Sequence, residues 1–179
     1  AVNALDAEAV MRLRQRKRRD AKPFAVMVRD LATAHQHCII SAGEEELLTS
    51  PAAPIVILQR REDSPLPAEA IHPGLKTLGV MLPYTPLHYL LFDDELRVLI
   101  MTSANISDEP LITVNEEALD KLGAVADFFL LHNRDIYNPC DDSVVQLTKG
   151  RTIHFMRRAR GYVPEGIPLG RPVLPVLAL

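Results

Sequence analysis

Short apolar runs alternate with amphipathic stretches along most of the chain. Each run is four or five residues long, the length of a strand that is buried on both faces and needs no polar alternation. The runs predict strands over residues 24–28, 54–58, 79–82, 97–101 and 128–131. Two later segments, residues 143–147 and 152–156, predict a β-hairpin that turns across residues 149–150.

The stretches between these runs carry helix signals. Asp6 is a suitable N-cap, and Leu5 and Val10 have the spacing of a hydrophobic staple, so a helix is expected over residues 7–19. The prolines of residues 61–73 indicate a surface loop. Strands that alternate with helices and end in a hairpin predict an α/β fold with a mixed sheet. The other predicted helices are residues 29–37, 43–48, 84–92 and 115–122.

Length and composition fit one globular domain, since 179 residues with 47% apolar side chains can bury a sizeable core. No apolar run approaches the roughly 20 residues that cross a bilayer, so we expect a cytoplasmic protein without a membrane partner. Cys38 and Cys140 stand too far apart in the sequence for a metal-binding pair. We therefore expect no zinc and no other protein-bound metal centre.

Positive charge is concentrated in one segment, although the whole chain has a net charge of −3. Residues 11–22 contain seven Lys and Arg residues against Asp20 alone. A solvated helix face would carry acidic residues among these cations, so an anionic ligand is favoured. The segment by itself does not separate the phosphates of a nucleotide from a nucleic acid. Lys17 shares a helical face with Val10 and Leu13, so its ammonium can reach the edge of the core.

Three further segments carry polar or charged side chains at predicted strand ends. Ser103 and Asn105 follow the fourth predicted strand, at the end where open α/β sheets bind ligands. Ser143 opens the hairpin after two aspartates, where a hydroxyl can bind phosphate and a carboxylate can hold Mg²⁺. Arginines that include Arg158 and Arg160 follow the hairpin. Each segment alone is also compatible with an ordinary turn.

Taken together and in order, these motifs resemble the YrdC-like domain, and more narrowly the version found inside the HypF carbamoyltransferases of nickel–iron hydrogenase maturation. The resemblance covers the chain from about Asp6 to Pro164. The motifs that carry it are Lys17-x-Arg19-x-x-Lys22-Pro23 with the strand that follows, the stretch from Gly79 to His88, Thr102-Ser103-Ala104-Asn105-Ile106-Ser107, residues 131–136, residues 141–145 and residues 157–164.

The resemblance implies a YrdC-like twisted open mixed sheet with flanking helices. The first strand of the family and its glycine-containing turn are not found before residue 7, so the domain is expected to lack that strand. Residues 1–163 would then form an N-terminally truncated nucleotide-binding domain. Residues 164–179, which are rich in proline, would form a linker toward an absent C-terminal domain.

The resemblance also implies a reaction, in which ATP with Mg²⁺ and a carbamate derived from carbamoyl phosphate give carbamoyl-adenylate and pyrophosphate. In the full-length protein the carbamoyl group would pass to the maturation protein HypE. Asp108 stands where the family usually has Gly, and a carboxylate there would weaken phosphate binding. The residues that match the family's nucleotide site are Lys17 and Arg19 as catalytic residues, with Lys22, Ser103, Asn105, Ser143 and one of Arg158 or Arg160 as nucleotide-binding residues.

Two other functions stay open at this point. The related enzyme class is a threonylcarbamoyl-adenylate synthase for tRNA modification, although residues 132–136 and 157–164 look more like the HypF version. The other class is a non-catalytic module that binds RNA or a nucleotide through the basic segment. RNA binding is disfavoured, and the sequence leaves open whether this chain is active alone.

Overall fold

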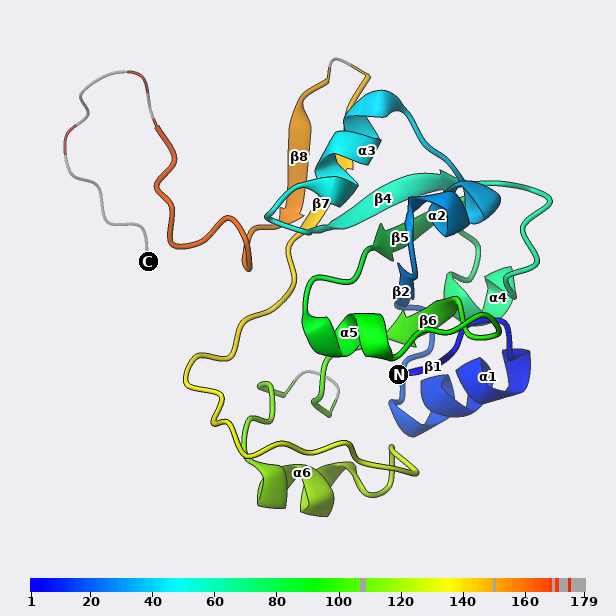
Figure 1. Ribbon diagram of the computed structural model, residues 1–179, viewed down its shortest axis with the longest axis vertical. Helices are drawn as coiled ribbons and strands as arrows, with labels where there is room; N and C mark the ends of the chain where they lie inside the picture. The colour runs from blue at the N-terminus through cyan, green and yellow to red at the C-terminus, as the bar shows by residue number, and fades with distance from the viewer. Residues whose placement is uncertain (107–108, 150, 169, 171–173, 175–179) are drawn as a thin grey trace.

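The computed structural model describes the chain from residue 1 to 179 apart from residues 107–108, 150, 169, 171–173 and 175–179. Among the described residues, eight strands form one mixed sheet in the order β1-β6-β2-β5-β4-β7-β8, with β3 paired to β4 outside this path (Figure 1). The strands are β1 (Val2–Asn3), β2 (Ala25–Val28), β3 (Cys38–Ile39), β4 (Ile55–Arg60), β5 (Thr77–Met81), β6 (Val98–Met101), β7 (Val144–Leu147) and β8 (Ile153–Arg157).

The sheet combines parallel and antiparallel pairs, as the alternation of strands and helices predicts. β2 pairs with β5 and β4 pairs with β7 in parallel, whereas the other neighbours are antiparallel. The β7–β8 hairpin is confirmed. β1 and β3 were not predicted, because a strand of two residues is too short to show a periodic pattern.

One face of the sheet carries the main core. Alternate strand residues such as Val26, Val56, Val80 and Ile100 pack there with apolar residues of the first four helices. The opposite face has a smaller cluster of Met27, Ile55 and Met81, against which Phe92 packs. The six helices of the described chain are α1 (Ala7–Arg16), α2 (Leu31–His37), α3 (Ala42–Thr49), α4 (Ala68–Ile71), α5 (Pro86–Leu90) and α6 (Asn115–Leu122).

Helix α1 begins as predicted and ends earlier than predicted. The Asp6 side chain accepts a hydrogen bond from Ala9 N, which confirms the cap. Arg18 then adopts a left-handed φ of 49°, and Arg19 N donates to Arg14 O. This 6→1 bond closes a Schellman-type turn, so the predicted helix over residues 17–19 is wrong and these residues form a turn.

The stretch between β6 and β7 differs most from expectation. The strand predicted over residues 128–131 is not formed, and Phe128 is 92% exposed and Leu130 70% exposed. An apolar run becomes a strand only where a neighbouring strand pairs with it, and no described strand pairs with residues 128–131. Helix α6, which precedes this run, lies apart from the sheet (Figure 1). Within residues 61–73, the expected loop includes the short helix α4.

Among the described residues of the C-terminal segment, Val163, Ile167 and Leu174 are exposed. None of the described helices is both long enough and apolar enough to cross a membrane.

Candidate functional site

The carboxyl end of β6 meets the turn after α1 through three predicted site residues. Lys17 Nζ donates to Ser103 O at 2.7 Å and to Asn105 Oδ1 at 3.2 Å. Asn105 Oδ1 also accepts from Ser103 Oγ at 2.8 Å, and its Nδ2 donates to Glu109 O. The structure therefore brings Lys17, Ser103 and Asn105 into direct contact, and the two oxygen acceptors hold the ammonium in one place.

Two further cations belong to the same group, which we call the Lys17 cluster: Lys17, Arg19, Lys22, Ser103 and Asn105. The Lys17 side chain is buried, with the residue only 5% exposed. Burial, and to a smaller extent the charges of Arg19 and Lys22, together lower the pKa of Lys17 to about 8. An anion beside these three cations would offset both the burial of the Lys17 charge and its repulsion by Arg19 and Lys22. The cluster therefore suits a phosphate or a carboxylate.

A cavity of about 440 Å³ adjoins the Lys17 cluster. Its polar wall includes Lys17, Ser103 and Asn105, and its apolar wall includes Leu13 and Phe129. The volume lies in the range of small-molecule sites, which are apolar with a few placed polar groups. Predicted site residues thus line a hollow rather than a flat surface.

A second group of charged and aromatic residues, the Arg160 cluster, lies at the start of β7 and is formed by Tyr84, His88, Asp142, Ser143 and Arg160. Arg160 makes an ion pair with Asp142 Oδ1 at 2.8 Å and donates to Ala52 O and Ala53 O. Its guanidinium lies 3.6 Å from the centroid of the Tyr84 ring. Most of its donors therefore bind the protein itself.

The Ser143 hydroxyl also forms its hydrogen bonds within the protein. Its side chain is fully buried, with Oγ donating to Arg160 O at 2.9 Å and accepting from Ala159 N at 2.7 Å. The next residue after Arg160 is Gly161, at φ +86°, where an added Cβ would meet Ala52 O at 2.3 Å. Ser143 and Arg160 were expected among the nucleotide-binding residues, and that role stays a prediction. In the structure their hydrogen bonds join β7 to the segments beside it.

Arg158 is the other arginine that the resemblance left open. It is half-buried, and its Nη2 donates to Glu165 O at 2.7 Å. Of the two candidates, Arg158 has the larger capacity for a further ligand, since Arg160 also holds a carboxylate and two carbonyl oxygens.

The two clusters lie at different places along the sheet. Three strands, β2, β5 and β4, stand between β6 and β7. Four spacings of roughly 4.8 Å amount to about 19 Å across the sheet. The expected residues therefore lie in two separate groups, and in the Lys17 cluster Lys17 itself lines a cavity.

The aspartates before Ser143 were considered as Mg²⁺ ligands. Asp142 binds Arg160 and Tyr84, and Asp141 pairs with Arg157 at 3.3 Å. In the described part of the chain, no group of three or more His, Cys, Asp or Glu residues could hold a metal ion. Mg²⁺ commonly binds through substrate phosphates with few protein ligands, so it fits this chain as a component of Mg·ATP.

One feature of the surroundings was not singled out from the sequence. Arg14 was counted with the basic segment, yet it is buried and makes five hydrogen bonds to four backbone carbonyl oxygens near the Lys17 cluster. Two of these oxygens, Ala70 O and Ile71 O, are 56 and 57 residues away along the chain, so no local pattern identifies them. Tyr84 and His88, from the stretch that carries the family resemblance, pack edge to face at 4.5 Å, with Arg160 over the Tyr84 ring.

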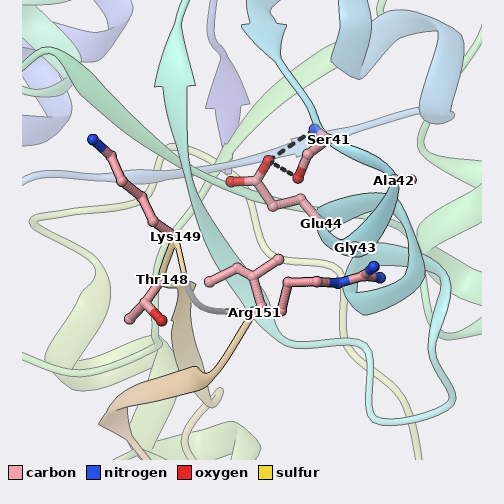
Figure 2. Close-up of a pocket in the computed structure, with 8 residues that line it drawn as sticks. Ser41, Ala42, Gly43, Glu44, Thr148, Lys149 and Arg151 are labelled. Carbon is pink, nitrogen blue, oxygen red and sulfur yellow. Dashed lines mark hydrogen bonds between the residues drawn. The ribbon is translucent and has the colours of Figure 1, made fainter.

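A second cavity, of about 410 Å³, lies between the start of α3 and the β7–β8 turn (Figure 2). Glu44 Oε2 accepts there from Ser41 N and Ser41 Oγ, so the carboxylate caps α3. Lys149 and Arg151 lie on the opposite wall. The cavity contains none of the predicted site residues.

Comparisons with known proteins agree with the fold. The Sua5/YciO/YrdC family model, described as "Telomere recombination", matches residues 1–159. Carbamoyltransferase HypF2 of Cupriavidus necator is 49% identical over 195 residues, which cover 100% of this chain and 24% of that protein. The chain thus spans about a quarter of this curated relative.

Solved structures point the same way. A crystal structure of full-length HypF in a phosphate- and nucleotide-bound form has a TM-score of 0.85 at 51% identity, over 92% of this chain and 26% of that chain. P. abyssi Sua5 complexed with L-threonine has a TM-score of 0.72 at 23% identity, over 88% of this chain and 46% of that chain, which shows the shared fold alone. The chain belongs to the Sua5/YciO/YrdC family, and its domain is the YrdC-like domain of the HypF kind.

Proposed function

We propose that this chain binds Mg·ATP at the Lys17 cluster and transfers the adenylyl group to a carbamate, as the adenylating domain of a carbamoyltransferase. The observation that carries the proposal is the buried Lys17 ammonium, fixed by Ser103 O and Asn105 Oδ1 and close to the charges of Arg19 and Lys22. Such a group offers fixed positive charge at the edge of a cavity.

The proposed reaction needs charge and placement more than a nucleophilic side chain. A carbamate oxygen attacks the α-phosphorus, the bond to the pyrophosphate leaving group breaks, and carbamoyl-adenylate forms. Two anions must approach each other, so cations that are already in position lower the barrier. Lys17 and Arg19 would neutralise the phosphates, while Ser103 Oγ and the Asn105 amide would orient them. Lys22, whose charge acts on Lys17, would add positive charge near the phosphates.

Relatives support this assignment. The sequence relative from Cupriavidus necator is the carbamoyltransferase HypF2, and a full-length HypF has been solved in a phosphate- and nucleotide-bound form. Because the chain spans about a quarter of such a protein, onward transfer of the carbamoyl group, with HypE as the acceptor, is proposed for the longer protein only. The similarity to Sua5 is a similarity of fold alone. The test below therefore includes L-threonine, the ligand of that Sua5 structure, as an alternative substrate.

Calorimetric titration of Mg·ATP into this chain tests the proposal. We expect saturable binding that is strengthened by carbamoyl phosphate and competed by a carbamoyl-adenylate analogue. Lys17→Ala should abolish the heat, whereas Lys121→Ala should not, because Lys121 pairs with Glu117 on the exposed surface of α6.

Other outcomes identify the competing functions. Strengthening by L-threonine with bicarbonate, and not by carbamoyl phosphate, would indicate the threonylcarbamoyl-adenylate reaction. If the chain does not bind Mg·ATP but binds RNA with an affinity that falls steeply as salt is added, it is a nucleic-acid-binding module.

A further inference from the structure

Arg14 is a buried cation whose partners are backbone carbonyls. The residue is 6% exposed and lies in the last turn of α1. Its Nε and Nη2 donate to Ala70 O at 3.0 and 2.8 Å, and Nη2 also donates to Ile71 O at 3.1 Å. These bonds join α1 to the end of α4, where carbonyl groups have no partner within the helix.

The third nitrogen of the same guanidinium, Nη1, binds the turn that contains Lys17, Arg19 and Lys22. Arg14 Nη1 donates to Arg19 O at 2.8 Å and to Lys22 O at 3.0 Å. Arg19 N in turn donates to Arg14 O, so Arg14 and Arg19 are joined in both directions. One side chain therefore sets where both ends of the segment 19–22 lie.

This turn needs such support because of its backbone. Arg18 has a φ of 49°, in the left-handed region that a Schellman-type turn usually fills with Gly. A residue with a side chain persists there only where surrounding contacts determine the conformation. The Phe24 ring adds to them, since Arg14 Cζ and Arg19 Cζ lie 4.6 and 5.1 Å from its centroid.

We propose that Arg14 is a positioning residue of the Lys17 cluster: without contacting the ligand, it holds Arg19 and Lys22 where they can act together with Lys17 on an anion. The inference rests on the proposed function for its ligand, Mg·ATP. A lysine at this position would keep the charge but lacks the planar fork of donors that reaches α4 and the turn at once.

The first test compares Arg14→Lys with Arg60→Lys. Arg60 is a matched control, because its Nη2 also donates to backbone carbonyls, those of Ser64 and Leu66, on another loop. We expect Arg14→Lys to weaken Mg·ATP binding on the order of tenfold through misplacement of the cations, with Arg60→Lys unchanged. Equal affinities in the two variants would overturn the proposal.

A double-mutant cycle separates positioning from general stability. If Arg14 acts through the turn, Arg14→Lys should cost little affinity in a chain that already carries Arg19→Ala and Lys22→Ala. Full additivity would contradict the proposal. If Arg14→Lys does not fold, Phe24→Leu serves as the second variant, since it removes the ring that both guanidinium groups contact.

A readout without nucleotide distinguishes failure of this inference from failure of the proposed function. The chain has five lysines, so the Lys17 ammonium can be followed by NMR in lysine-labelled protein. Arg19 and Lys22 help to lower the pKa of Lys17 to about 8. Loosening of the turn in Arg14→Lys should therefore raise this pKa, even if the native chain binds no Mg·ATP. An unchanged Lys17 pKa would overturn the positioning role.

Discussion

The turn after α1 and the start of β7 are both rich in arginine, and they differ in what their charges contact. At the start of β7, Arg160 is bound by Asp142 and by two carbonyl oxygens. In the turn, Arg14 donates to the carbonyl oxygens of Arg19 and Lys22, and Lys17 lines a cavity while the charges of Arg19 and Lys22 act on it. The contacts of the first cluster join parts of the fold, and we propose that the second cluster offers its charge to a ligand.

This difference shows that the number of cations in a motif does not identify an anion site. An ion pair with a carboxylate already neutralises a guanidinium, whereas the Lys17 ammonium, whose pKa the nearby charges of Arg19 and Lys22 help to lower, would gain from an added anion. Variants of the two clusters should therefore affect different measurements, binding for one and stability for the other.

The largest expected effect comes from Lys17→Ala. Loss of the fixed ammonium should slow ATP–pyrophosphate exchange on the order of 10² to 10³-fold, as for loss of a preorganised charge or donor at a reacting group. The exchange of labelled pyrophosphate into ATP measures it. Unfolding by denaturant should show that Lys17→Ala folds, because the substitution removes a buried charge.

Arg160→Ala should lower the free energy of unfolding by about 3 kcal/mol, since it leaves Asp142 and two carbonyl groups without their donor. Denaturant unfolding checks the loss of stability. Under conditions where the variant is folded, its affinity for Mg·ATP should stay near the native value. A large loss of affinity with unchanged stability would show that Arg160 contacts the nucleotide after all.

Ser143→Ala tests the same cluster more gently. It leaves Ala159 N and Arg160 O without the buried hydroxyl, which should cost about 1.5 kcal/mol of stability. Thermal unfolding measures this cost, and calorimetry should find Mg·ATP binding unchanged. If binding fell while stability held, Ser143 would be a phosphate ligand, as the family resemblance implies.

The smallest expected effect concerns pH. Lys17 attracts phosphate only when protonated, and its pKa is lowered to about 8. Bound phosphate raises that pKa, so the affinity for Mg·ATP should fall by roughly tenfold per pH unit above pH 8 and stay level below it. Calorimetry between pH 6.5 and 9 checks this slope, and Lys17→Arg should flatten it because arginine stays charged.

Most of the larger elements could be predicted from the sequence because each signal is local. Asp6 caps α1, and the apolar runs of β2, β4, β5 and β6 are short enough to be strands and too short to be helices. The run at residues 128–131 shows the limit, since a strand also needs a neighbour with which to pair. The first strand's absence, the linker role of residues 164–179 and the effect of Asp108 stay predictions, and Asp108 lies outside the described residues.

The site was predictable in part for the same reason. Lys17, Ser103 and Asn105 meet because one ends a helix turn and the others end a strand, which local patterns indicate. The partners of Arg14 and Arg160 lie up to 57 and 108 residues away along the chain, so only the folded structure reveals them. Long-range partners are what separate a supporting arginine from one that can bind a ligand.

Titration of Mg·ATP into the native chain and its Lys17→Ala and Arg160→Lys variants at pH 7 tests the central claim most directly. We predict saturable binding by the native chain, nearly the same affinity in Arg160→Lys, and no measurable binding in Lys17→Ala. Native affinity in Lys17→Ala, or a loss of binding confined to Arg160→Lys, would contradict the assignment of the Lys17 cluster as the nucleotide site.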